Sequence, residues 1–490
     1  MSLPSPHPRR WTALALIALA QFLVIMDTSI IGVALPEIQR AIGFSQAELS
    51  WVFNAYVIAF GGLLLLGGRL SDLYGARRVF VTGFIILAGA SLMTGLAGSE
   101  VVLLAGRALQ GVGSALIAPA ALTLLMTLFA HDPKELTKAL ALYGAAAPAG
   151  GTAGVFLGGL LTDAVDWRWV FFINVPIALV VLAATRGVLP AGLARRGNLD
   201  IAGALAVTGA LSLAVLGVVR ATEIGWGSAE TLLVLGAAIG LLAIFLVLQA
   251  RGREPLMPLS IWRAPDLAAA NIAMALLGAA WIPMWFFLNL YLQQVLRFGA
   301  FDGGAALLPM TVTIMVLMVG VTARLVGRFG FKAPLVTGMI VLAGGIGWLG
   351  FVRADGSFLV DVLPATIVAA TGMSLAYIPA MLAALSGAQP AEGGLAAGIV
   401  NTTYQVGSAL GLAVITAIAT AAGASQLGDI SALTDGFRAA FFGASAIAVV
   451  GAAFALVALR RRVSIGAPAA GSGPVAITDD AAYEDRPAGA

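Results

Sequence analysis

The amino-acid sequence predicts an all-α integral membrane protein. Of the 490 residues, 60% are hydrophobic and only 10% are charged, whereas about 25% of the residues in a soluble globular protein are charged. So few charges cannot cover the surfaces of several soluble domains. A spanning helix needs about 20 apolar residues, so the apolar content is sufficient for about fourteen spans. Short alternating strands, which a membrane β-barrel requires, are not visible in the sequence.

Fourteen apolar runs are separated by charged or turn-forming clusters. The first run follows Arg9 and Arg10 and continues for about 25 residues, too long for the apolar part of a cleavable signal peptide, so we expect it to remain as the first helix. We expect spanning helices at residues 12–35, 50–68, 79–97, 102–128, 138–161, 169–187, 200–219, 231–249, 267–295, 304–323, 334–352, 360–385, 395–422 and 437–459.

The positive charges predict how these helices are oriented. With the N-terminus in the cytoplasm, nineteen Lys and Arg residues, Arg195 and Arg196 among them, fall on the cytoplasmic side. Only six fall on the outer side, namely Arg40, Arg168, Arg220, Arg297, Arg353 and Arg438. An excess of Lys and Arg marks cytoplasmic loops. We therefore expect a multi-pass protein of the cell (cytoplasmic) membrane with both termini in the cytoplasm.

The chain contains an internal repeat. Residues 67–83 (GGRLSDLYGARRVFVTG) align without gaps on residues 322–338 (TARLVGRFGFKAPLVTG), with Arg77 opposite Lys332. Each segment lies between the second and third helices of a six-helix set if two helices are inserted between the sets. We expect a six-helix half at 1–190, the two inserted helices and their loops at 191–255, a second six-helix half at 256–462 and a disordered cytoplasmic tail at 463–490. Parallel six-helix repeats are typical of the major facilitator fold.

Seven motifs in the same order resemble the fourteen-helix drug:proton antiporters of the major facilitator superfamily. Two positions depart from the usual pattern, with Gly32 where Asn is common and Val155 where Pro is expected. The motifs are MDTSIIGVALP from Met26, GGRLSDLYGARR from Gly67, LLAGRALQGVGSA from Leu103, GGTAGVFLGG from Gly150, WRWVFFINVP from Trp167, YLQQV from Tyr291 and GIVNTTYQVGSALG from Gly398. The resemblance covers about residues 10–460 and implies a proton-driven exporter of drugs.

Two charges lie deep in the expected spans. Asp27 is the only acid well inside a span, and Arg107 is the only base at such a depth. A charge buried in the membrane requires a partner or, for a carboxylate, a proton. We therefore expect Arg107 to tune a proton-coupling site that includes Asp27. Asp27 could instead contact substrate, and either residue could have a purely structural role.

The loop after the second helix is the expected gate. The resemblance implies that this loop clamps the cytoplasmic side of the outward-open state through Gly68, Asp72, Gly75, Arg77 and Arg78. Asp72 can accept hydrogen bonds from the loop of helix 11 or from the neighbouring arginines. Because Gly327 replaces Asp72 in the second repeat, we expect an asymmetric gate. The alternative is a turn that only sets topology.

Four glycines form the antiporter motif of helix 5. Gly150, Gly154 and Gly158 recur every four residues and so share one helix face, with Gly159 beside them. We expect this face to pack against a helix of the other half and to limit proton leak on the outer side. Generic packing of small residues is the alternative.

The expected substrate pocket is mainly apolar, with aromatic and amide groups. Many of the aromatic side chains could instead face lipid or the protein core. The candidates are Asn54, Tyr56, Trp281, Trp285, Phe286, Asn289, Gln293, Asn401, Tyr404 and Gln405.

Other function classes lack their residues. There is no Cys, there are only two His, and no phosphate-binding loop of the form GxxxxGK[ST] is present. We therefore expect neither an enzyme nor a metal site, and no cofactor. We also expect no nucleic-acid partner, because the basic residues are interspersed between apolar blocks and form no basic patch. A channel would not explain two asymmetric gate loops. The expected partners are an amphipathic small molecule, protons and the lipid bilayer, and the protein is expected to be a monomer. The alternative cargo is a lipid, an envelope component or a self-made antibiotic.

Overall fold

The computed structural model is built from α-helices, and the part of the chain that it describes contains no strand. It describes residues 9–44, 51–129, 131–190, 200–252, 255, 257, 259–263, 266–386, 393–424, 426 and 428–460. The expected tail at 463–490 lies outside these residues, as do Arg195 and Arg196.

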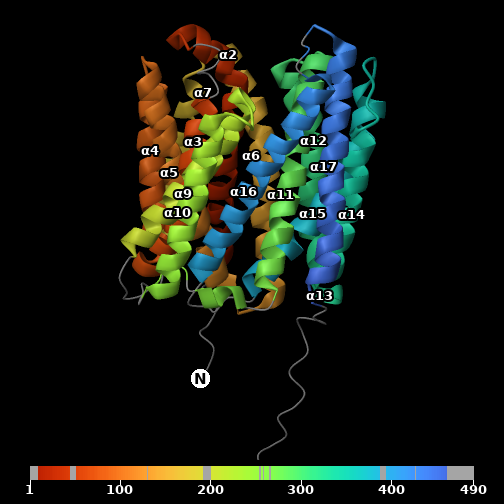
Figure 1. Ribbon diagram of the computed structural model, residues 1–490. Helices are drawn as coiled ribbons and strands as arrows, with labels where there is room; N and C mark the ends of the chain where they lie inside the picture. Colours follow the sequence, from red (N-terminus) through yellow and green to blue (C-terminus); the bar gives the residue numbers. More distant parts are fainter. Residues whose placement is uncertain are drawn as a thin grey trace, which may run out of the picture.

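The helices follow the apolar runs (Figure 1). Four short π-helical segments and one 3₁₀ segment continue or connect them. The elements are α1 (Arg10–Ser29), α2 (Ile31–Ile42), α3 (Trp51–Tyr74), α4 (Ala76–Gly95), α5 (Glu100–Phe129), α6 (Pro133–Ala164), α7 (Trp169–Phe172), α8 (Asn174–Val188), α9 (Ile201–Ile224), α10 (Ala229–Arg251), η2 (Leu259–Arg263), α11 (Leu267–Leu290), η3 (Tyr291–Val295), α12 (Ala300–Leu317), η4 (Met318–Thr322), α13 (Ala323–Phe329), α14 (Lys332–Leu349), η5 (Phe358–Val362), α15 (Leu363–Ser386), α16 (Gly393–Ala419), η7 (Thr420–Ala424) and α17 (Ile430–Ala458).

Thirteen helices of the described chain are long and apolar enough to cross a membrane. The remaining expected span, 200–219, is also helical and forms part of α9. Its apolar stretch, Ala202–Val218, is shorter than the others.

Polar residues at the helix ends explain where several helices begin. Asp132 accepts from the backbone N–H of Lys134 (2.8 Å) at the start of α6, and Asp429 accepts from that of Ser431 (2.9 Å) at the start of α17. Asp200 does the same for α9. These side chains satisfy N–H groups that have no partner within the helix.

The helix bundle has a terminal side, where α1 begins and α17 ends, and an opposite far side (Figure 1). On the terminal side, Arg10 forms an ion pair with Glu135 at the start of α6 (2.8 Å). Arg9 donates to the carbonyl of Gly187 at the end of α8 (3.2 Å). These contacts fix the start of α1 against two other helices of the first half.

The sequence repeat has a structural counterpart. Gly75 and Gly330 occupy equivalent positions and both have positive φ, +89° and +72°, which glycine adopts without strain. The equivalent cations Arg77 and Lys332 donate to the carbonyls of Leu189 (3.3 Å) and Leu459 (2.5 Å). Each cation therefore binds the C-terminus of the last helix of its own six-helix set, where the helix dipole favours positive charge.

The two inserted helices differ in their surroundings. α9 packs against α3 and α16, through a cluster that includes Leu65, Val207 and Ile399. Ser212 of α9 also lies against Gly62 of α3. In contrast, α10 presents large apolar side chains outward, among them Leu233 at 73% exposure. The outward apolar surface of the inserted pair therefore belongs mainly to α10, while α9 covers the α3–α16 contact.

Candidate proton-coupling site and gate

Asp27 lies at the centre of a fully buried polar network in the first half. Its Oδ2 accepts from Arg107 Nη1 (3.0 Å), and its Oδ1 accepts from Gln110 Nε2 (3.1 Å) and Asn174 Nδ2 (2.5 Å). Neither side chain of the Asp27–Arg107 pair has any exposed surface. Ser91 of α4 accepts from the same two amides, at 2.8 and 3.3 Å. The network therefore joins four helices, α1, α4, α5 and α8.

Arg107 is held in place by groups on two helices. Its Nε donates to the carbonyl of Val52 (3.0 Å), and its Nη1 also donates to Gln110 Oε1 (3.0 Å). The guanidinium lies 4.6 Å from the centre of the Tyr56 ring. Its Nη2 is buried without a hydrogen-bond partner among the described residues. The cation is therefore firmly positioned, yet one of its donors is unused.

The hydrogen bonds match an ionised carboxylate at Asp27. Both oxygens face donors, and an ionised carboxylate only accepts. A proton on Oδ2 would point at the Arg107 guanidinium, and a proton on Oδ1 would point at the two amides, so proton uptake requires at least one of these contacts to break. The network can therefore couple the protonation of Asp27 to the position of Arg107.

The sequence predicted the charged pair but not its amide partners. Gln110 lies three residues after Arg107 on α5, and Asn174 belongs to the motif that begins at Trp167. The spacing of Gln110 was a usable signal, because residues three apart are neighbours on a helix. No such signal identified Asn174 or Ser91.

The expected gate residue Asp72 connects the two halves. Its Oδ2 accepts from the backbone N–H of Leu395 in the first turn of α16 (3.0 Å). α3 and α16 approach closely here, since a Cβ added to Gly398 would lie 3.5 Å from the Cα of Gly68. Leu395 begins the thirteenth expected span, so this partner on the second half is not the loop of helix 11 that was expected. Arg77 instead binds the end of α8, and Arg78 is exposed.

The expected partner of the α6 glycine face was wrong. Cβ atoms added to Gly154 and Gly158 would lie 2.8 Å from Met26 O and 2.7 Å from Ile30 O, and Gly150 lies against Phe22 O. The glycines therefore pack against α1 and its junction with α2, within the first half. Gly159 is buried beside them. Because helix spacing defines a face but not its partner, the sequence could not distinguish the two choices.

Other residues of α6 contact the second half. The hydroxyls of Thr152 and Thr311 lie 2.5 Å apart, joining α6 to α12. Nearer the far side, the rings of Phe156 and Phe301 lie 4.9 Å apart. Threonine and phenylalanine side chains therefore take part in the contact between α6 and α12.

Tyr56 was wrongly expected to line the substrate pocket. It is fully buried inside the first half, where its hydroxyl donates to Val24 O (3.3 Å) beside Arg107. Asn401 donates to Ala397 O of its own helix, and Gln293 donates to Asn289 (3.0 Å).

The remaining candidates differ in exposure. Asn54 and Gln405 are half-buried, Trp281 is buried and Phe286 is exposed.

Two candidates do lie where the halves meet. A Cβ added to Gly151 of α6 would lie 3.8 Å from Trp285 Cζ2 of α11. The ring of Tyr404 packs edge-on against that of Tyr377, with centres 5.9 Å apart. A Cβ added to Gly144 would in turn lie 3.3 Å from the Tyr377 ring.

Two further polar residues next to this region were not expected. The Tyr143 hydroxyl donates to Gln21 Oε1 (2.8 Å), and Tyr143 precedes Gly144 on α6. Together with Tyr377 and Tyr404, they provide hydroxyl and amide groups without formal charge. Gln21, an amide inside the first apolar run, was a signal that could have been used.

Comparison with known proteins gives a consistent result. The family model for the Major Facilitator Superfamily matches residues 17–412. The chain is 38% identical to the cephamycin export protein CmcT of Amycolatopsis lactamdurans over 436 residues, which cover 88% of this chain and 89% of that protein. It is 37% identical to the puromycin resistance protein pur8 of Streptomyces alboniger, covering 86% and 84%. It is 34% identical to the tetracenomycin C resistance and export protein of Streptomyces glaucescens, covering 86% and 77%.

Solved structures share the fold. The human organic anion transporter MFSD10 superposes with a TM-score of 0.67 at 15% identity, covering 92% of this chain and 100% of that one. The proton:xylose symporter XylE superposes with a TM-score of 0.65 at 14% identity, covering 91% and 95%.

Proposed function

The chain belongs to the major facilitator superfamily, and we propose that it exports an antibiotic or a similar amphipathic small molecule in exchange for protons. Membership of a transporter family confirms the expectation of a transporter rather than an enzyme. The names of the relatives support the cargo, since they refer to cephamycin, puromycin, tetracenomycin C and lincomycin.

The proton would bind at Asp27. In the structure Asp27 is bound as a carboxylate by Arg107, Gln110 and Asn174. Protonation would turn one acceptor into a donor and release Arg107, whose Nη2 already lacks a partner. Since these residues come from α1, α5 and α8, a change in their bonds can alter how the first-half helices pack. The buried bonds that join Asp27 to residues of two other helices are the observation that carries the proposal.

The gate would open where Asp72 meets α16. We propose that the terminal side faces the cytoplasm of the cell membrane, as the charge distribution predicts. The bond from Leu395 to Asp72 then keeps the cytoplasmic side closed, and its loss would permit the halves to rock apart. The charged pair and the gate are complete within one chain, which supports a monomer as the working unit.

A self-made antibiotic is the favoured alternative to a foreign drug. Two relatives have "export" of a named antibiotic in their own names. No comparable observation favours a lipid or an envelope component.

Inverted membrane vesicles with an acidified lumen test the proposal. Addition of cephamycin, puromycin, tetracenomycin C or lincomycin should dissipate the pH gradient in vesicles that contain the wild type. Asp27→Asn should abolish this response, whereas Asp355→Asn should retain it, because Asp355 is exposed in a loop. Full proton-coupled transport by Asp27→Asn would refute the assigned role. A wild type that responds to none of the compounds would count against the antibiotic cargo.

A further inference from the structure

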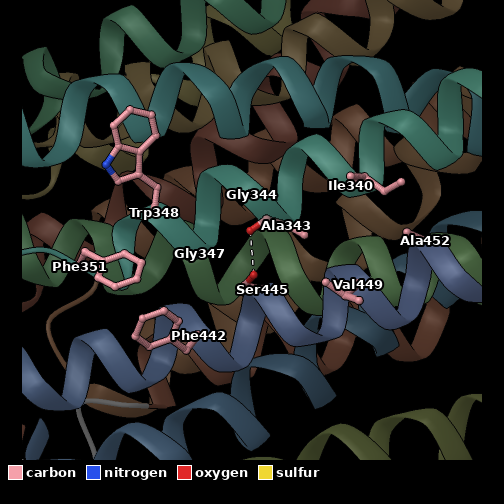
Figure 2. Close-up of a pocket in the computed structure, with 10 residues that line it drawn as sticks. All are labelled: Ile340, Ala343, Gly344, Gly347, Trp348, Phe351, Phe442, Ser445, Val449 and Ala452. Atoms are coloured by element: carbon pink, nitrogen blue, oxygen red, sulfur yellow. Dashed lines mark hydrogen bonds between the residues drawn. The ribbon is translucent and has the colours of Figure 1, made fainter.

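A groove on the outside of the second half lies between α14 and α17 (Figure 2). Its volume is about 660 Å³, and its walls include Ile340, Trp348, Phe442 and Val449. Both helices are membrane spans, and Trp348 is 48% exposed near the end of α14. Exposed tryptophans at span ends typically mark the membrane interface. The groove therefore faces the hydrocarbon chains of the far-side leaflet.

The only hydroxyl among the groove residues is already bonded within the protein. The Ser445 hydroxyl donates to the carbonyl of Ala343 (2.7 Å), as the dashed line in Figure 2 shows. Gly344 leaves the floor open, because no atom outside its own helix would lie within 4 Å of a Cβ added there. The groove extends from Phe442 to Ala452 along α17, about 15 Å at 1.5 Å per residue. This is about half the thickness of the hydrocarbon core, the length of a single leaflet.

A polar hollow lies at the far-side end of the same helix pair. It has a volume of about 190 Å³ and is lined by Arg353, Asp435 and Arg438, among others. Arg438 lies one turn before Phe442 on α17, so the hollow directly follows the groove. The Arg438 side chain, 42% exposed, donates to Gly350 O (3.1 Å) and to Asp435 (3.2 Å).

The charges in this hollow match a head group with both signs. Arg353 is already bound through two nitrogens by Asp361 (2.8 and 3.1 Å). Arg438 and Asp435, 42% and 60% exposed, share a single contact from Arg438 Nη1 to Asp435 Oδ1 (3.2 Å), so the other guanidinium nitrogen Nη2 and the carboxylate oxygen Oδ2 can meet a head group. A phosphate can accept from a guanidinium, and a primary ammonium can donate to a carboxylate.

We propose that this groove and hollow form a binding site for phosphatidylethanolamine of the far-side leaflet. One acyl chain lies in the groove over Gly344, the phosphate binds Arg438, and the ammonium binds Asp435. Phosphatidylglycerol offers the phosphate but has no ammonium. Phosphatidylcholine has a cation that cannot donate a hydrogen bond.

Native mass spectrometry of the delipidated full-length protein tests the site. The three lipids, with identical acyl chains, are titrated separately and the first binding event is compared. The wild type should bind phosphatidylethanolamine at least about tenfold more tightly than the other two, a difference typical of one charge-assisted hydrogen bond.

Two variants separate the chain from the head group. Gly344→Leu places a side chain in the groove, where a Cβ would meet nothing within 4 Å, and should weaken the binding of phosphatidylethanolamine about tenfold, because a chain of methylene groups loses its apolar contact. Asp435→Ala should remove the preference among the lipids, because only phosphatidylethanolamine has an ammonium that can donate to this carboxylate. Gly240→Leu is the matched control, since Gly240 is equally open on the exposed face of α10. Unchanged binding by Gly344→Leu, or equal binding of all three lipids by the wild type, would overturn the proposal.

Discussion

The buried pair of Asp27 and Arg107 makes a quantitative prediction about stability. If Arg107 is replaced by Gln, Asp27 keeps the amide donors of Gln110 and Asn174 but loses its cation. Removing one partner of a fully buried ion pair costs about 3–5 kcal/mol, because the other charge stays buried and uncompensated. We expect Arg107→Gln to lower the free energy of unfolding by this amount.

Asp27→Asn should be similarly costly although it changes no volume. Both oxygens of Asp27 face donors, whereas an amide has one oxygen and one NH₂ group. The NH₂ group must therefore face a donor, and the Arg107 charge is left with only neutral acceptors, Val52 O and Gln110 Oε1.

The double variant distinguishes a specific pair from two unrelated losses. Asp27→Asn combined with Arg107→Gln contains no buried charge, and its two amides can bond to each other. We expect it to be more stable than the sum of the single losses predicts, by about 2 kcal/mol. Reversible unfolding in mixed detergent micelles measures all four proteins. Additive losses would refute the reasoning, since they would mean that the two charges do not depend on each other.

Three further variants test the other contacts. Gly154→Leu should force α1 away from α6 and lower the thermal stability in detergent. Gly151→Ala, whose Cβ would meet nothing closer than 3.7 Å, should be tolerated. Equal stability of the two variants would contradict the close packing of Gly154 against α1. Asp72→Ala should increase the distance between α3 and α16 at the terminal side, measured between spin labels on introduced cysteines, which would be the only thiols in the chain. Asp72→Asn, which retains a hydrogen-bond acceptor, should increase this distance less. An unchanged distance in both variants would show that Asp72 does not hold α3 and α16 together. Lys332→Ala should lower the free energy of unfolding by about 0.3–1 kcal/mol, because it removes a cation from the end of α17. Lys332→Arg keeps the cation and should retain most of this stability. If neither variant loses stability, the contact is not stabilising.

The sequence predicted the fold because its signals are local. Apolar runs and glycine turns depend only on neighbouring residues, and the repeat that aligned Arg77 with Lys332 predicted two equivalent turns. The contact between Asp27 and Arg107 was also predictable, since each is the only charge of its sign at that depth. Their roles in transport stay predictions.

The sequence could not predict which surfaces meet. Three glycines at four-residue spacing define a face of α6, but α1 and a helix of the second half are equally compatible with it. Lipid provides no hydrophobic drive that would favour one of them. The error for Tyr56 has the same origin, because position along a helix gives depth in the membrane and not direction around the helix axis.

The repeats also explain why the proposed gate would depend on one half. Arg77 and Lys332 make equivalent contacts, because each binds the end of the last helix in its own half. Neither of these contacts joins the two halves. Asp72 instead accepts a hydrogen bond from α16 in the other half. Gly327, which replaces it in the second repeat, has no side chain that could accept one.

The inserted helix α9 covers this contact, packing against both α3 and α16. When these two helices separate, α9 must leave at least one of them and expose apolar surface to lipid instead of water. This exchange costs little in a membrane, because lipid chains are as apolar as the side chains they replace. The insertion can therefore cover the proposed gate from the side and still permit α3 and α16 to separate.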